Sequence, residues 1–264
     1  MNPQIYLPLV ALAIVCTIML CAWLWGTKIH NYSVVDAFWS FNFAVIAVFI
    51  YLMAEGNETR KLIVCALAFL WSLRLGTHLS KRIFSHLDIE EGRYKQLRQE
   101  WKKNTHLKFF FFFQMQAVSN IWLAFPFFIL ATNSNPEMCW PEYAGAAIWL
   151  ISIVGEAISD WQLDHFKKNP SNKGKVCDIG LWYYSRHPNY FFQLMIWIGV
   201  SLFSVCSPCG WLAIISPLTI AYLLFKVTGI PMTEEQSLRS KGDAYRDYQR
   251  TTSVFVPWKK KVEV

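Results

Sequence analysis

Residues 180–190 read Gly-Leu-Trp-Tyr-Tyr-Ser-Arg-His-Pro-Asn-Tyr and end where a long apolar stretch begins. Pro188 suits the first turn of a helix, so the pattern places Arg186, His187 and Asn189 around a helix N-terminus. Free backbone N–H groups, a guanidinium fork and a ring donor together make a natural anion site. Because a plain helix cap needs only one Ser or Asn, we interpret this segment as functional.

A second polar group precedes that segment. Glu156, Asp160, Asp164 and Lys167 are spaced by four, four and three residues, which places them on one face of a helix. An Asp164–Lys168 ion pair on a solvated helix end is the simpler interpretation of part of the group. It does not explain Glu156 and Asp160, which lie within the apolar part, where ionisable residues are costly.

Two further groups have weaker patterns. Glu234, Glu235 and Arg239 fall in a short C-terminal segment, where acids at a helix start ordinarily complement the helix dipole. The other group interrupts apolar stretches and consists of Asp36, Trp39, Arg74, His78, Gln114 and Gln116. It lines a cavity between helices or joins the helices by hydrogen bonds, and the pattern leaves both interpretations open.

Membrane-spanning helices are the elements that must position these groups. Hydrophobic residues make up 54% of the 264 residues and charged residues only 16%, against about 25% charged in soluble domains. This composition disfavours a soluble enzyme, a secreted disulfide scaffold or a disordered chain. Nucleic acid binding would account for the net charge of +7 but not for the apolar content.

We therefore predict an all-α integral membrane protein, a seven-transmembrane helix bundle that forms one membrane domain over residues 1–264. Stretches of about 20 apolar residues suffice to cross a bilayer. The spans are expected at residues 5–25, 34–54, 62–80, 109–131, 143–161, 190–206 and 211–230. A basic segment between the third and fourth spans is expected to form a helix along the membrane interface.

The basic residues are distributed asymmetrically between the two sides of this bundle. With the N-terminus outside, 23 of the 25 Lys and Arg residues fall on the cytosolic side, and only Arg60 and Lys61 fall outside. This is the distribution that the positive-inside rule predicts. The C-terminal helix is then cytosolic.

The C-terminal region is expected to form one short helix and an extended tail. We expect Pro231 to end the seventh span, and Thr233 and Gln236 have the spacing of a capping box. A cytosolic helix is therefore predicted to start near Glu234. The apolar tail at residues 253–258 is predicted to fold back onto the bundle.

The cysteines and glycines exclude several kinds of site. The seven cysteines and six histidines show no metal-ligand spacing, so no metal is expected. Cys206 and Cys209 form a lone Cys-x-x-Cys, in which we do not expect a disulfide. None of the 12 glycines occurs as Gly-x-Gly, so a nucleotide would have to be held by charged helix ends and loops.

The chain resembles a known membrane superfamily. Residues 180–190, with Glu234-Glu235, Tyr245, Tyr248 and Pro257, are similar to the superfamily of steroid 5-alpha-reductases, sterol reductases and isoprenylcysteine carboxyl methyltransferases. Further matches extend the resemblance to the bacterial 5-alpha-reductase-like branch: Asp36–Trp39, Trp71-Ser-Leu-Arg-Leu75, Arg82, Arg93-Tyr94 and Gln116. The resemblance covers nearly the whole chain and implies a bacterial inner-membrane protein.

For a reductase, the resemblance implies NADPH held by the inner halves of spans 5 to 7, within about residues 136–264. Spans 1 to 4, within about residues 1–135, would form a lipid-accessible substrate cavity. Asp160, Lys167, Tyr184, Arg186 and Asn189 match cofactor-contacting positions. The full candidate set for the cofactor is Glu156, Asp160, Asp164, Lys167, Tyr184, Arg186, His187, Asn189, Tyr190, Gln193, Glu235 and Arg239.

Two residues depart from the pattern of the branch. Gln193 stands where a carboxylate is usual, although its amide can still donate to and accept from a carboxamide. Glu156 stands where steroid reductases have an amide. The substrate identity therefore stays open among steroid, isoprenoid and fatty enones.

Hydride transfer to an enone needs a hydrogen-bond donor at the ketone oxygen. Asp36 is similar in placement to the acid that helps polarise the ketone in the reductases. A carboxyl group in apolar surroundings can stay protonated and donate. We therefore expect Asp36, supported by Arg74 or His78, to be catalytic, with Trp39 and Gln116 against the substrate.

Two other function classes remain as alternatives. Methyl transfer from S-adenosylmethionine to an isoprenylcysteine or similar lipid is the alternative enzyme, and its sulfonium would favour Glu234 and Glu235. The basic residues favour NADPH, which carries several phosphate charges. A non-enzymatic transporter or lipid-binding protein is the third class, although transporters more often show inverted repeats.

Overall fold

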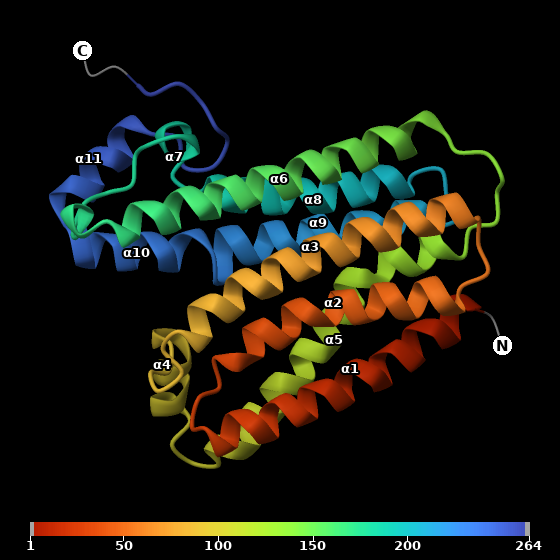
Figure 1. The fold of residues 1–264 in the computed structure, drawn as a ribbon, viewed down its shortest axis with the longest axis horizontal. Helices are drawn as coiled ribbons and strands as arrows, with labels where there is room; N and C mark the ends of the chain where they lie inside the picture. The colour runs from red at the N-terminus through yellow and green to blue at the C-terminus, as the bar shows by residue number, and fades with distance from the viewer. Residues whose placement is uncertain (1–2, 262–264) are drawn as a thin grey trace. The chain divides into compact units, whose positions relative to one another are not determined.

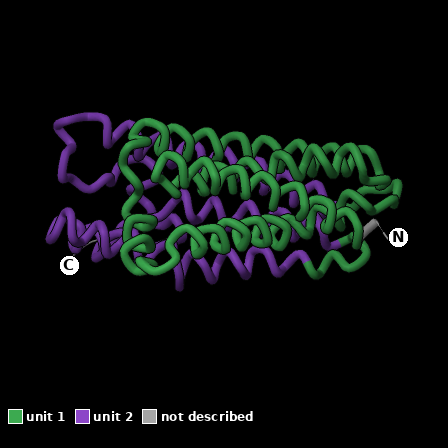
Figure 2. Tube along the Cα trace, turned by 90° about the horizontal axis from the view of Figure 1, so that it is seen from below, with its two compact units in different colours: residues 1–139, 206–212 green, residues 140–205, 213–264 purple. Residues whose placement is uncertain are grey.

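The computed structural model describes residues 3–261, and all of the longer regular elements in that range are helices (Figure 1). The chain forms two compact units, which Figure 2 distinguishes by colour. Unit 1 comprises residues 1–139 and 206–212, and unit 2 comprises residues 140–205 and 213–264.

The helices of unit 1 are α1 (Pro3–Lys28), α2 (Val34–Met53), α3 (Glu58–Phe84), α4 (Gly92–Glu100) and α5 (Thr105–Ala131). Unit 2 contains α6 (Trp140–Lys168), η1 (Pro170–Asn172), α7 (Leu181–Tyr184), α8 (Pro188–Ser204), α9 (Ile215–Tyr222), η3 (Leu223–Val227), α10 (Ile230–Lys241) and α11 (Asp243–Thr251). The short helix η2 (Gly210–Ile214) crosses the boundary between the units. The expected helix in the basic segment is confirmed as α4.

Six helical stretches in the described range are long and apolar enough to cross a membrane. Five of them contain α1, α2, α3, α5 and α6, and the sixth runs over Gly210–Lys241. The remaining predicted span, at residues 190–206, corresponds to α8, which has 17 residues. This length is at the lower limit of a membrane span. A multi-pass membrane protein is therefore supported, and seven spans remain a prediction.

Small residues bring α6 and α8 into close contact in unit 2. A Cβ atom added at Gly145 would lie 2.4 Å from the backbone nitrogen of Phe203 and 2.6 Å from the carbonyl oxygen of Gly199. Gly199 has the same constraint, because its added Cβ would lie 2.9 Å from the carbonyl oxygen of Gly145. Close backbone approach at small residues is a common means of packing helices in membranes.

Gly145→Ala is expected to destabilise the fold by about 1–3 kcal/mol, because the added methyl group forces two backbones apart. The measurement is the thermal unfolding temperature of the detergent-purified protein. Gly92→Ala is the matched control, since a Cβ atom at Gly92 has nothing within 4 Å. Equal unfolding temperatures for the two variants would contradict the prediction.

The predicted start of the C-terminal helix was wrong. α10 begins at Ile230 after Gly229, with Pro231 in its first turn, where the missing N–H of proline costs nothing. Thr233 does not cap the helix, since its Oγ1 donates to the Gly229 carbonyl oxygen at 2.9 Å. The preceding helix is interrupted instead by the π-helical turn η3.

The expectation that Cys206 and Cys209 are not bonded to each other is confirmed, but a bond to a distant cysteine was not predicted. Cys206 forms a disulfide, but its partner is Cys139, 67 residues away, and not Cys209. No local spacing indicates this pairing, because it depends on which interhelical connections meet at the same end of unit 1.

Candidate functional site

The segment 180–190 is anchored on α6. Gly180 has a φ of +57°, a conformation that side chains other than glycine rarely adopt. The side chain of Gln162 fills the space beside it and accepts from the backbone N–H of Leu181 at 2.9 Å. Trp182 is buried and donates from its ring nitrogen to the Ser159 carbonyl oxygen at 2.9 Å. These contacts place the segment at the C-terminal half of α6.

Two of the predicted cofactor-binding residues are in contact. The Asn189 side chain donates from Nδ2 to Oδ1 of Asp160 at 3.1 Å, which joins the start of α8 to α6. Its Oδ1 accepts from the backbone N–H of Tyr190 at 3.0 Å. Asp160 is buried, so its carboxylate is held in a site of low polarity. Asp160 and Asn189, both named as cofactor contacts by the resemblance, are thus hydrogen-bonded to each other, and their role toward a cofactor remains a prediction.

Arg186 has a different environment from the one predicted. Its Nε lies 2.8 Å from Oε1 of Glu234, and its Nη1 donates to the carbonyl oxygens of Gln249 at 2.6 Å and Thr252 at 3.3 Å. The guanidinium that was expected to bind an anion from outside the chain thus binds Glu234 of α10 and backbone carbonyl oxygens at the end of α11. Its charge is compensated by a carboxylate of this chain, and only a tenth of the side chain is exposed.

Of the two acids Glu234 and Glu235, Glu234 is the one that contacts the segment 180–190. Besides Arg186, it lies 3.3 Å from Nε2 of His187 and accepts from Nε2 of Gln249 at 2.9 Å. The predicted cofactor residues Glu235 and Arg239 instead form an ion pair with each other at 2.5 Å. Both side chains of that pair are mostly exposed, so it lies apart from the buried contacts of Glu234.

His187 and Tyr190 face α10. The two rings are stacked, with centroids 5.4 Å apart and an angle of 4° between their planes. The Tyr190 hydroxyl lies 3.1 Å from Oγ1 of Thr233, within hydrogen-bond distance. His187 is buried, so its imidazole contributes to packing between α8 and α10 as well as to the contact with Glu234.

The C-terminal tail folds back onto the segment 180–190, as predicted. Backbone bonds join Arg186 N–H to the Ser253 carbonyl at 2.9 Å and Trp258 N–H to the Tyr184 carbonyl at 2.9 Å. Ser185 Oγ donates to the Phe255 carbonyl at 2.8 Å. The tail is therefore fixed by backbone hydrogen bonds, which do not depend on its side chains.

Tyr245 and Tyr248 of α11 complete this arrangement. The Tyr248 hydroxyl donates to the Trp182 carbonyl oxygen. Burial raises the pKa of Tyr245 to about 12 and raises the pKa of Tyr248 further above its usual value. Both phenols therefore remain neutral donors at physiological pH.

The other predicted cofactor residues of unit 2 lie in varied surroundings. Glu156 is buried on α6, whereas Asp164, Lys167 and Tyr184 are exposed. Gln193 on α8 is half-buried. The predicted face of α6 is thus buried at its apolar end and exposed toward its last turn.

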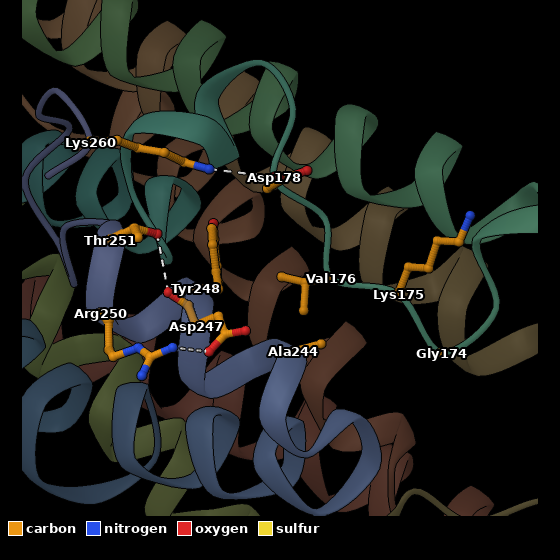
Figure 3. A pocket seen from close by; sticks show the side chains of 10 residues that line it. All are labelled: Gly174, Lys175, Val176, Asp178, Ala244, Asp247, Tyr248, Arg250, Thr251 and Lys260. Atoms are coloured by element: carbon orange, nitrogen blue, oxygen red, sulfur yellow. Dashed lines mark hydrogen bonds and ion pairs between the residues drawn. The ribbon is translucent and has the colours of Figure 1, made fainter. Parts of the chain in front are cut away.

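Several lysines gather at the same end of unit 2. Lys167, in the last turn of α6, lies near enough to Lys241, in the last turn of α10, for their positive charges to repel each other. A cavity of about 420 Å³ lies between the loop after α6, α11 and the tail (Figure 3). Lys175 and Lys260 line it, and Lys260 pairs with Asp178 at 3.4 Å. Asp178, Asp247 and Arg250 line the same cavity, so its charge is mixed, and Lys175 is the lining cation that has no carboxylate partner among the described residues.

Asp36 in unit 1 is paired differently from the expectation. Its Oδ1 accepts from the Tyr94 hydroxyl at 2.5 Å, and its Oδ2 lies 3.7 Å from Nη2 of Arg82. Arg82, His78 and Arg74 are spaced by four residues on α3, and the contact to Asp36 comes from Arg82. Arg82 makes its closer ion pair with Glu91, Nε to Oε1 at 2.7 Å, so its contact with Asp36 is the weaker of the two. The expected roles of Asp36, Arg74 and His78 remain predictions.

The predicted substrate residues Trp39 and Gln116 are joined through Ser119. The Trp39 ring N–H donates to Oγ of Ser119 at 2.9 Å, and that hydroxyl lies 3.3 Å from Oε1 of Gln116. These contacts link α2 to α5. They agree with the alternative interpretation of this group, in which polar side chains join helices by hydrogen bonds.

Sequence reasoning missed the role of Tyr94. The residue is fully buried although its segment is basic, and its phenol is the hydrogen-bond partner of Asp36. Burial raises the pKa of Tyr94 well above its usual value of 10. No local pattern indicates this contact, because Tyr94 and Asp36 are 58 residues apart in the sequence and only the tertiary structure brings them together.

Comparison with known proteins gives two matches. A family described as a protein of unknown function, DUF1295, matches residues 22–252. An uncharacterized protein of the fission yeast Schizosaccharomyces pombe is 26% identical over an alignment of 269 residues, which covers 89% of this chain and 75% of that protein. No solved structure matches the chain.

Proposed function

The chain belongs to the DUF1295 family, which is the steroid 5-alpha-reductase-like family, and on this premise we propose that it is an NADPH-dependent membrane reductase. The proposed substrate is a lipid enone, such as a 3-oxo-4-ene steroid, reduced at its carbon–carbon double bond. NADPH, when bound, supplies the hydride. We also propose that the chain falls in the bacterial branch of the family, in the inner membrane with a cytosolic C-terminus.

The contact between Tyr94 and Asp36 is the observation that carries this proposal. When an enone is reduced, negative charge develops on its carbonyl oxygen, and a donor placed there lowers the barrier. The Tyr94 phenol is neutral, buried and held by Asp36 at 2.5 Å. We assign Tyr94 as the donor: its single O–H, which donates to Asp36 in this structure, would turn to the carbonyl oxygen of a bound enone. Asp36 would position the phenol, and Arg82 would be shared between Asp36 and Glu91.

The residues of unit 2 fit the proposed cofactor. Asp160 and Asn189 offer a buried carboxylate and an amide in one hydrogen-bonded pair. Lys167 and Lys241 repel each other, and a phosphate near both would relieve that repulsion. Arg186 is a weaker candidate for a phosphate ligand than these lysines, because Glu234 compensates its charge and its Nη1 donates to two carbonyl oxygens.

Methyl transfer from S-adenosylmethionine is the second candidate. The acids Glu234 and Glu235 would suit its sulfonium charge. Against it, Glu234 already forms an ion pair with Arg186, contacts His187 and accepts from Gln249, and Glu235 pairs with Arg239. Both charges are thus compensated within the chain, which leaves less attraction for a cation.

Cofactor binding to the detergent-purified protein tests this proposal. We expect NADPH to bind and S-adenosylmethionine not to bind, measured by isothermal titration calorimetry. Asp160→Ala is expected to lower the NADPH affinity about 10-fold or more, because a hydrogen bond to a charged group is lost from a buried site. S-adenosylmethionine binding without NADPH binding would overturn the proposed reaction class.

Asp164→Ala is the matched control for that measurement. Asp164 belongs to the candidate set but is exposed, one helical turn further along α6. We propose that it lies outside the cofactor site, so its removal is expected to leave the NADPH affinity unchanged. If both variants reduce the affinity equally, the buried Asp160–Asn189 pair has no specific part in binding.

A further inference from the structure

Three connections of unit 1 lie at the same end of its helices. Residues 54–57 join α2 to α3 as a helical hairpin, and residues 132–139 follow the end of α5. The segment Cys206–Leu212 belongs to unit 1 although the residues on both sides of it belong to unit 2. We call these three segments, with Glu58, Arg60 and Lys61, the disulfide cap.

Arg60 holds the second of these connections in place. Its Nη1 donates to the carbonyl oxygens of Asn133 at 3.1 Å and Asn135 at 2.8 Å, and its Nη2 donates to that of Glu137 at 2.8 Å. The side chain is almost fully buried. One guanidinium thus orders the chain up to two residues before Cys139.

The disulfide ties the third connection to the second. Cys139 and Cys206 are bonded, and next to the bond Nδ2 of Asn133 donates to Oγ of Ser207 at 2.9 Å. Cys206 is exposed and Cys139 is half-buried, so the bond lies near the surface of unit 1. Cys209 is an exposed free cysteine in the same segment.

We propose that the disulfide cap lies in an oxidising compartment, outside the cytosol. A disulfide persists there, whereas the cytosol keeps thiols reduced. In its formation, the thiols of Cys139 and Cys206 lose two protons and two electrons to the disulfide of an oxidoreductase, which becomes a dithiol.

The charges of the disulfide cap independently agree with this assignment. Arg60 and Lys61 are the two cations that do not follow the positive-inside distribution. The Arg60 side chain donates hydrogen bonds to three carbonyl groups. Lys61 donates to the Ala54 carbonyl at 3.0 Å and to Glu58 at 2.8 Å. Neither offers the exposed positive charge that retains a loop in the cytosol.

The assignment has a consequence for the proposed donor pair. α2 runs from Asp36, in its first turn, to Met53 at the disulfide cap. The opposite end of unit 1, with Asp36 and α4, then faces the cytosol, where NADPH is available. The inference itself does not depend on the proposed reductase activity.

Sequential cysteine labelling of the full chain in intact cells tests the proposal. A membrane-impermeant maleimide is added first, and a second, mass-distinct maleimide follows treatment with an impermeant phosphine reductant. Peptide mass spectrometry then locates both tags. We expect the first tag on Cys209 and the second tag on Cys139 and Cys206.

Internal and matched controls make each outcome decisive. Cys177, on the connection after α6, is expected to react only after lysis and unfolding. Cys206→Ser is expected to move Cys139 into the first labelling step, whereas Cys209→Ser leaves the pair unchanged. Labelling of wild-type Cys139 and Cys206 only after permeabilisation, or their recovery as free thiols, or a bond between Cys206 and Cys209, would overturn the proposal.

Discussion

Tyr94→Phe is expected to lower turnover of a lipid enone by about 10²–10³-fold, the usual cost of removing one donor to a developing oxyanion. The substitution removes only the hydroxyl that Asp36 holds at 2.5 Å. NADPH affinity is expected to stay unchanged, because the candidate cofactor residues belong to unit 2. Steady-state kinetics and NADPH titration on the same preparation measure the two effects.

Tyr32→Phe is the matched control for this variant. Tyr32 is also a fully buried tyrosine of unit 1, and its hydroxyl lies 2.7 Å from Nδ1 of His106. Its loss is expected to affect stability but not the chemical step. If Tyr94→Phe and Tyr32→Phe retain the same turnover, Tyr94 is not the donor.

The pKa of Tyr94 adds a condition to this prediction. Because burial raises it above the usual value of 10, the phenol stays protonated at least up to that pH. The donor form is therefore present throughout the range in which the enzyme can be assayed. A fall in turnover below pH 10 would have to come from another group.

The helices were predictable because apolar runs of membrane length have few other structures available to them. The α2 span was expected at 34–54 and is found at Val34–Met53, and α4 was found where the basic segment predicted it. The start of α10 was not predictable from a capping pattern. Thr233 has the residue type of a cap, yet a hydroxyl in the first turn can equally donate back to the carbonyl of Gly229.

The candidate site was predictable where its residues share one helix face. Spacing along α6 indicated Asp160, and its contact with Asn189 follows from the packing of α6 on α8. The partner of Arg186 was not predictable, because a guanidinium binds a phosphate or a carboxylate with the same geometry. The choice depends on Glu234, which only tertiary structure brings to it. The Cys139–Cys206 pairing has the same physical cause.

Glu234→Ala is expected to destabilise the protein by about 3 kcal/mol, because it leaves the mostly buried charge of Arg186 without its carboxylate. In that variant only the Gln249 and Thr252 carbonyl oxygens would remain to stabilise the positive charge of Arg186. We expect the tail to loosen. Thermal unfolding measures the stability, and hydrogen exchange at Arg186, whose N–H bonds to Ser253, measures tail docking.

Glu235→Ala separates this interpretation from a general effect of removing an acid from α10. Its partner Arg239 is exposed, and such surface pairs contribute about 0–1 kcal/mol. Equal destabilisation by the two variants would contradict a specific role for Glu234. Arg186→Lys separates two roles of the arginine, since one ammonium cannot replace the fork that binds Glu234 and two carbonyls. A loosened tail in that variant identifies Arg186 as the anchor of the tail, whereas an ordered tail with weakened NADPH binding would identify it as a phosphate ligand.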